Sequence, residues 1–250
     1  MNEVPQPQSE PVVLEKKSYL QRVFGMFTEP REVFQYIDEK PGIILALLIP
    51  VLATVMISVA AIVQNFRNPQ YLETMKKMPE TMSNVMKYGA SVIGAIFGVV
   101  FVLIILLVQA GIIHVIAPFL NGKGSFKKLL CVLGYSSVPS LILGILSLIY
   151  IAINQNDYIP FSASLGLFFT QEKVGLYWHA LSQSIDIISF WSMGLVILGV
   201  SIIYKFSWKK AAVIILAFWL LGVGLGLGVI KAFEPFYKNA QQQQVEGETD

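Results

Sequence analysis

The stretch Asn121–Ile153, NGKGSFKKLLCVLGYSSVPSLILGILSLIYIAI, joins a short basic loop directly to an apolar run. The apolar run begins at Leu129 and is long enough to cross the hydrocarbon core of a bilayer, about 30 Å thick, as a helix. Lys123, Lys127 and Lys128 stand immediately before it, and basic residues beside a span tend to stay on the cytoplasmic side. The stretch therefore predicts a membrane span that runs outward, and the other spans can be counted from it.

The composition is that of a membrane protein. Of the 250 residues, 55% are hydrophobic and 14% are charged, whereas about a quarter of the residues in a soluble domain are charged. The formal net charge of +2 is too small to indicate a nucleic-acid partner, and the single cysteine, Cys131, excludes a disulfide framework. The expected fold is an all-α membrane protein whose main partner is the lipid bilayer.

Four further apolar runs have membrane-spanning length. We expect spans at Gly42–Val63, Ser91–Leu120, Leu129–Ile153, Ser184–Tyr204 and Ala211–Ile230. Together they predict a five-span helix bundle over residues 41–231. We expect residues 1–17 to be a disordered cytoplasmic tail and residues 232–250 to be a polar tail, of which the last ten residues, 241–250, are disordered.

Charge sets the predicted orientation. The two short loops 121–128 and 205–210 hold six lysines and no acidic residue in 14 positions, while the long segments 64–90 and 154–183 hold five basic residues in 57. The short loops are therefore predicted to be cytoplasmic. With five spans, the N-terminus is then cytoplasmic and the C-terminus lies outside, in a multi-pass protein of the cell membrane.

Residues 18–40 precede the first span and read as two short amphipathic helices that meet at Pro30. Leu20, Val23, Phe24 and Phe27 share one face of the first, and Val33, Phe34 and Ile37 share one face of the second, with charged residues opposite. Two interpretations stand side by side. The helices either lie in the inner membrane interface or pack beneath the bundle as a cap.

The two long segments are predicted to lie at the outer surface. In the first, Met75, Met78, Met82 and Met86 recur at helical spacing. This pattern favours an amphipathic helix over a cuprous-ion site, because methionine is a common filler of apolar faces. In the second, aromatic residues suggest a segment at the interface or dipping into the bilayer: Tyr158, Phe161, Phe168, Phe169, Tyr177 and Trp178.

Polar residues within spans are costly and often functional. The spans contain Gln109, His114, Ser136 and Ser137, with Asp186 at the head of the fourth. A proton relay between His114 and Asp186 is disfavoured because their predicted depths differ by about 20 Å. We expect His114 to be an interfacial or interhelical hydrogen-bonding residue, Gln109 to bond a neighbouring helix, and Asp186 to sit near a helix N-terminus.

Two features predict helix geometry. Pro139 removes a backbone hydrogen bond, and the hydroxyls of Ser136 and Ser137 can satisfy the carbonyl it frees, so the third span should bend there. Small residues four apart let helices approach closely. Such pairs occur at Gly94 and Gly98, and again in the fifth span, where they predict contact with two neighbouring helices or a dimer: Gly222, Gly224, Gly226 and Gly228.

Catalytic signatures are missing from the sequence. It contains no GxxxxGK[ST], HExxH or GxSxG motif, and GKGS at 122–125 lacks phosphate-loop spacing. The two histidines, His114 and His179, form no metal-ligating motif with a nearby carboxylate. We therefore expect no enzyme activity, no cofactor and no metal.

Three stretches resemble the bacterial form of the Yip (Ypt-interacting protein) domain family. They are FTEPREVF at 27–34, GSFKKLL at 124–130 followed by Gly134, Tyr135 and Pro139, and KFSWKKA at 205–211 preceded by Trp191 and Gly199. The resemblance covers residues 20–230. It implies a five-span bundle with a cytoplasmic N-terminus. Eukaryotic relatives bind Rab-type GTPases, but their Asp-Leu-Tyr-Gly-Pro motif is missing here, so that partner is not carried over.

The leading hypothesis is a non-enzymatic membrane scaffold or accessory protein that acts through helix–helix and interface contacts. Some bacterial relatives look like accessory proteins of export systems, and a role in export or membrane organisation fits this interpretation. Its partner would be another membrane protein or a second copy of itself. The alternative is a small transporter or channel, suggested by the bend in the third span and by Gln109 and Ser136.

Overall fold

The structure is a computed structural model that describes residues 17–81, 85, 89, 91–154, 163–169 and 171–246. Within these residues, five helical segments are long and apolar enough to cross a membrane. They span Ile43–Asn65, Ser91–Leu120, Phe126–Ile153, Ile187–Tyr204 and Trp208–Glu234. The predicted all-α, five-span, multi-pass membrane fold is confirmed.

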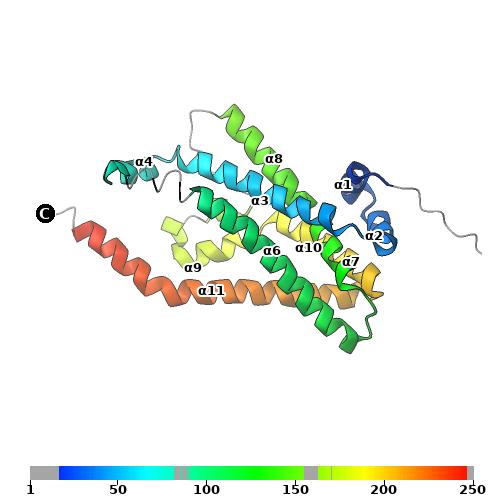
Figure 1. Cartoon of the computed structure of the whole chain (residues 1–250). Helices are drawn as coiled ribbons and strands as arrows, with labels where there is room; N and C mark the ends of the chain where they lie inside the picture. The colour runs from blue at the N-terminus through cyan, green and yellow to red at the C-terminus, as the bar shows by residue number, and fades with distance from the viewer. Residues whose placement is uncertain are drawn as a thin grey trace, which may run out of the picture.

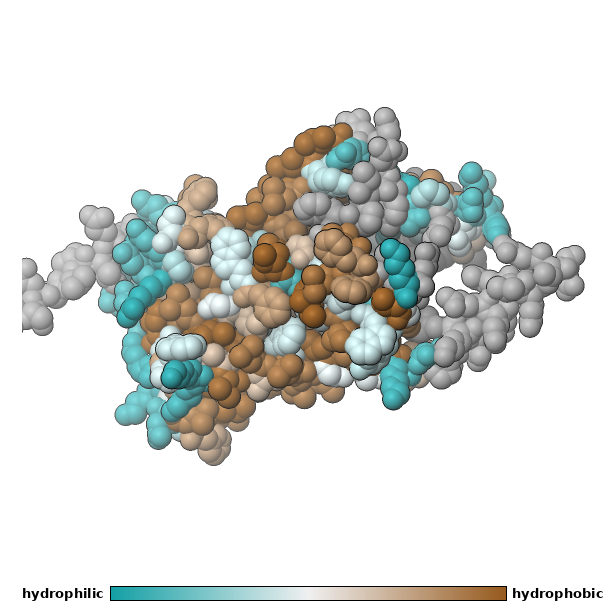
Figure 2. All heavy atoms as spheres, turned by 180° about the vertical axis from the view of Figure 1, so that it is seen from behind, coloured by the Kyte–Doolittle hydropathy of each residue, from teal (hydrophilic) through white to brown (hydrophobic). Residues whose placement is uncertain are grey.

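The molecule is elongated, and its helices run roughly along one axis (Figure 1). The N-terminal helices α1 (Tyr19–Thr28) and α2 (Pro30–Glu39) lie at one end, and the last turns of α11 (Trp208–Glu246) lie at the other. Figure 2 shows hydrophobic residues across the middle and hydrophilic residues gathered at the end that carries α1 and α2. The apolar band is the surface that contacts the lipid bilayer.

The two N-terminal helices have clear local start signals. Ser18 caps α1 in a capping box with Gln21, and Pro30 occupies the first turn of α2, where its missing N–H costs nothing. Val33, Phe34 and Ile37 of α2 are fully buried, and α2 packs on α10 (Ile187–Tyr204) and α7 (Phe126–Tyr135). This contact agrees with the interpretation in which the N-terminal helices pack against the bundle.

Helix α1 exposes part of its predicted apolar face. Leu20 and Phe24 are 65% and 68% exposed, which fits the interpretation in which this face lies in the membrane interface. Arg22, expected on the exposed face, is only 8% exposed. The helix is turned so that Val23, Met26 and Phe27 pack inward, because the rings around Arg22 hold that side chain against the bundle.

The third span is divided into α7 and α8 (Val138–Ile153), which are separated at Ser136 and Ser137. The first span, α3 (Ile43–Asn65), packs alongside both. At its far end the Arg67 guanidinium donates to the carbonyls of Ile151 and Asn154, at 3.2 and 2.6 Å. Arg67 thereby satisfies carbonyls at the end of α8 that lack helical partners.

Helices α6 (Ser91–Ile116) and α11 form the least enclosed part of the bundle. Only 6% of the residues in the most apolar 18-residue stretch of each helix are buried, compared with 28–33% in the other three spans. After α6, the chain continues through the 3₁₀ turn η2 (Ala117–Leu120). The exposed faces of α6 and α11 are therefore free to face lipid or another protein.

Short elements lie between the spans. They are α4 (Pro69–Lys76), the 3₁₀ turn η3 (Leu165–Leu167) and α9 (Gln171–Gln183). Gly175 interrupts α9 with a φ of 79°, a left-handed conformation that favours glycine. Met82, Met86, Tyr158 and Phe161 lie outside the described residues.

The C-terminal prediction is partly wrong. Helix α11 continues to Glu246, well past the expected end of the span at Ile230. Residues 231–246 contain good helix formers such as Ala, Lys, Gln and Glu, so a helix that is already nucleated in the span can extend into them. Residues 1–16 and 247–250 lie outside the described part of the chain.

Candidate functional site: a polar groove between two spans

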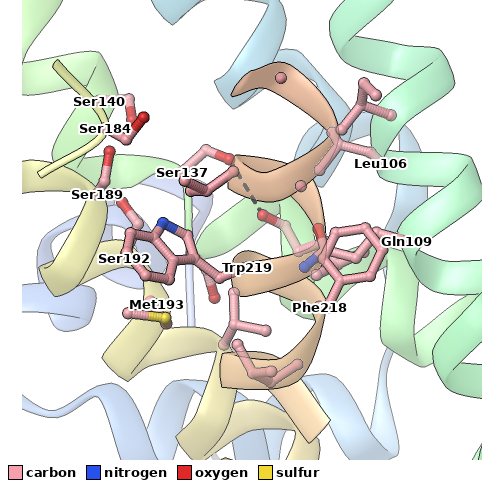
Figure 3. A pocket seen from close by; sticks show the side chains of 18 of the residues that line it. Leu106, Gln109, Ser137, Ser140, Ser184, Ser189, Ser192, Met193, Phe218 and Trp219 are labelled. Atoms are coloured by element: carbon pink, nitrogen blue, oxygen red, sulfur yellow. Dashed lines mark hydrogen bonds between the residues drawn. The ribbon is translucent and has the colours of Figure 1, made fainter. Parts of the chain in front are cut away.

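A cavity of about 670 Å³ lies between α6 and α11. Its floor comes from the α7–α8 bend and from α10, and residues of α9 and the following turn close one end. The volume falls within the roughly 300–1,000 Å³ of typical ligand pockets. Figure 3 shows Ser140, Ser184, Ser189 and Ser192 on one side and Gln109 on the other. We call this cavity the serine groove, and its polar lining residues are Gln109, Ser136, Ser137, Ser140, Gln183, Ser184, Ser189 and Ser192.

Two hydroxyls of the serine groove have no hydrogen-bond partner among the described residues. Ser136 is 1% exposed and its Oγ is unpaired, and the buried Oγ of Ser192 is likewise unpaired. Ser137 instead donates to the carbonyl of Leu133 at 3.1 Å, within its own bend. A buried hydroxyl without a partner costs roughly 1–3 kcal/mol, so Ser136 and Ser192 are better satisfied when something occupies the groove.

The glycines of α11 divide between two faces. Gly222 and Gly226 line the serine groove, whereas Gly224 and Gly228 do not. A Cβ atom built on any of the four would meet nothing within 4 Å. These four glycines therefore do not mediate the predicted close packing against two neighbouring helices among the described residues, because no atom lies close enough to an added Cβ. Contact with a second molecule remains a prediction.

Gly94 and Gly98, the other predicted packing pair, differ in their contacts. A Cβ on Gly98 would lie 3.5 Å from Cγ2 of Thr54 and 3.8 Å from Oγ of Ser58, so this glycine packs against α3. A Cβ on Gly94, one turn earlier, would meet nothing within 4 Å. Only one member of the pair therefore mediates close approach within the chain.

His114 and Asp186 both lie outside the serine groove. His114, in α6, contacts the C-terminal end of α10, and Asp186 stands at the N-terminal end of α10. His114 Nδ1 is 2.7 Å from the hydroxyl of Tyr204, the last residue of α10. Asp186 is the N-cap of the same helix and accepts from the Ile188 N–H at 2.9 Å. An 18-residue helix separates them by about 27 Å. The two residues therefore do not form a relay pair.

Pro139, the predicted bend residue, is buried and does not line the groove.

The Yip1 domain family model matches residues 24–230, which is most of the chain. The chain belongs to the Yip1 domain family. Among curated proteins and among solved structures, no match to the chain is found. The matched range includes α2, the serine groove and the five spans up to Ile230, and it leaves out the first half of α1 and the end of α11.

Aromatic rings close the end of this Yip1 domain at which α2 packs on α10. Tyr204 stacks on Phe206 with ring centroids 5.8 Å apart, and His114 lies edge-on to Phe126. A Cβ on Gly124 would lie 2.5 Å from the Tyr204 ring, and one on Gly122 would lie 2.5 Å from the Phe206 ring. The loop after η2 needs glycine at both positions because it passes directly over these rings.

Three glycines that sequence reasoning did not select as packing residues hold the Yip1 core together. A Cβ on Gly134 would clash with the carbonyl oxygen of Ala46, and one on Gly199 would clash with the side chain of Val132. A Cβ on Gly144 would lie 2.9 Å from Cβ of Met56. Each of these glycines lies in a helix that also carries large apolar residues. Gly98 differs from them, because a Cβ there would make only ordinary van der Waals contacts, at 3.5 and 3.8 Å.

Asp38 is a second feature that sequence reasoning missed. Its carboxylate accepts from Lys128 at 2.6 Å and from Lys205 at 2.8 Å, joining α2 to both basic loops. Partial burial acts to raise the pKa of Asp38, but hydrogen bonds from the two lysines outweigh it, and the net pKa is lowered. The lysines that predict orientation from sequence therefore also anchor the N-terminal helices.

Proposed function

We propose that this protein is a non-enzymatic membrane accessory protein whose serine groove receives a transmembrane helix of another protein or of a second copy. The observation that carries the proposal is the combination of open glycines and unpaired hydroxyls in one lateral groove. Gly222 and Gly226 leave room for a helix backbone, and Ser136 and Ser192 offer hydrogen bonds. Small residues and hydroxyls are the groups that transmembrane helices use to associate.

The chemistry of the groove supports a non-enzymatic role. No charged residue, histidine or cysteine is among its lining residues. A serine hydroxyl becomes a nucleophile only when an adjacent base or a metal activates it. His114, the histidine in the second span, is instead hydrogen-bonded to Tyr204 at the C-terminal end of α10.

The proposal is tested by crosslinking in native membranes followed by mild solubilisation and identification of the captured proteins. Gly226→Leu places a large side chain in the groove, whereas Gly228→Leu places one on α11 outside it. Loss of a stoichiometric partner in Gly226→Leu, with retention in Gly228→Leu, is the expected result. Equal capture by both variants would reject the groove as the docking site.

A small transporter is the second candidate, and the polar lining of the groove favours it. The lining continues from Ser184 at the outer turn to Gln109, deep in the second span. Gln109 makes no hydrogen bond to any residue that the structure describes, so it is available to a solute. Flux of a solute into liposomes that disappears in Gln109→Leu would support transport over docking.

A further inference from the structure

Arg22 is a buried cation that has no anionic partner in the described part of the chain. It is 8% exposed, and its guanidinium carbon lies 5.9, 5.5 and 5.8 Å from the ring centroids of Tyr19, Tyr36 and Tyr135. Its only hydrogen bond there is a long one, from Nε to the Ser18 carbonyl at 3.4 Å. No carboxylate lies within 4 Å of it among the residues described.

The three rings offset only part of the cost of burying this charge. A guanidinium over an aromatic face gains about 0.5–2 kcal/mol, whereas an unpaired buried charge is strongly unfavourable. Arginine carries five N–H donors, and the Ser18 carbonyl takes one. The Tyr135 hydroxyl, also in this cluster, is buried and unpaired among the described residues. The cluster therefore has more donors than acceptors and a net positive charge.

A glycine borders the guanidinium. A Cβ on Gly42 would lie 3.7 Å from Nη1 of Arg22, an ordinary van der Waals distance, so no side chain of the residue before the first span covers that nitrogen. Two residues further on, at the start of the span, Ile44 is 79% exposed. A donor cluster at the start of a span, beside an exposed apolar residue, matches the chemistry of a phosphate group at the membrane interface.

We propose that the Arg22 cluster binds a phosphate group at this end of the bundle. The planar guanidinium can donate two parallel hydrogen bonds to a phosphate, which a lysine cannot. Two sources offer that chemistry, the headgroup of an anionic phospholipid and free inorganic phosphate. The bound phosphate supplies the negative charge that the cluster lacks, and in the lipid case its acyl chains extend along the exposed start of the first span at Ile44.

The test is the apparent melting temperature of the full-length protein in a neutral detergent, measured with and without added anion. Three probes are added separately: dioleoyl-phosphatidylglycerol, dioleoyl-phosphatidylcholine and inorganic phosphate. A ligand present at about 100 times its dissociation constant should raise the melting temperature by several degrees. We expect that rise with phosphatidylglycerol, and a rise with inorganic phosphate alone would identify free phosphate as the source.

Two variants locate the binding. Gly42→Leu covers Nη1 while keeping the guanidinium, and Arg22→Lys keeps the charge but loses the paired donors. Both should lose the rise, and Arg31→Met, which removes an exposed arginine of α2, should keep it. The proposal is overturned by the absence of any rise in the wild-type protein, by an equal rise with phosphatidylcholine, or by a rise that Gly42→Leu leaves intact.

Discussion

Asp38 and Lys128 form an ion pair in which Oδ1 and Nζ are 2.6 Å apart. Lys205 approaches the other carboxylate oxygen at 2.8 Å. The pair connects α2 to the first turn of α7, at the start of the third span, and the second lysine adds the loop after the fourth span. One carboxylate therefore links three segments that are far apart in the sequence.

Asp38→Asn should destabilise the protein by about 1–2 kcal/mol, because it leaves the partly buried Lys128 without a counter-charge. Lys205 is 67% exposed on its side chain, so most of the loss should come from Lys128. The measurement is thermal unfolding in detergent, with Glu39→Gln, an exposed neighbour on α2, as the matched control. Equal effects of the two variants would show that the position of the carboxylate does not matter.

The lowered pKa of Asp38 predicts a pH dependence. A carboxyl whose pKa is lower in the folded state than its ordinary value of 3.8 contributes stability above that ordinary value. The contribution should be lost as the pH falls below about 4 and through the folded-state pKa. Wild-type melting temperatures between pH 2.5 and pH 7 should show this loss, and Asp38→Asn should show a smaller one. Parallel curves for the two proteins would contradict the assignment.

Gly134→Ala should destabilise the bundle by about 1–3 kcal/mol, because the new methyl group would overlap the backbone carbonyl of Ala46 and force α7 away from α3. Gly194→Ala is the control, since a Cβ there meets nothing within 4 Å. Unfolding of both variants in the same detergent provides the comparison. If Gly134→Ala were as stable as Gly194→Ala, the close approach of the two helices would be refuted.

Tyr204→Phe should cost about 1 kcal/mol, because it removes the hydroxyl that bonds His114 while keeping the ring that stacks on Phe206. Tyr177→Phe, on an exposed residue of α9, is the control and should be neutral. The free energy of unfolding of each variant is measured against the wild type. A neutral Tyr204→Phe would mean that this hydrogen bond adds nothing to stability.

The membrane fold could be predicted from the sequence because it depends on the length of apolar runs and on few other features. The position of the bend could be predicted because Pro139 has a local effect on the backbone. Packing depends instead on which helix faces which. Gly134 and Gly199 are single glycines among apolar residues, and only the approach of Ala46 and Val132 shows their role. The fifth span has the stronger pattern of glycines in its sequence, yet its four glycines from Gly222 to Gly228 contact no other helix among the described residues.

The serine groove could be predicted only in part. Gln109, Ser136 and Ser137 were selected because polar residues in spans are rare, and the structure brings these three together. Ser189 and Ser192 of α10 join them only through the arrangement of the helices. Arg22 could not be found in this way, because its position opposite the apolar residues of α1 is typical of an exposed arginine.

The most direct test of the docking proposal is site-specific photocrosslinking in native membranes. A photoreactive amino acid is placed either at Gly226, in the serine groove, or at Leu225, which is 64% exposed outside it. The proposal predicts one discrete protein adduct from position 226, identified by mass spectrometry as another membrane protein or a second copy, and little from position 225. Lipid adducts alone from position 226, or identical protein adducts from both positions, would contradict it.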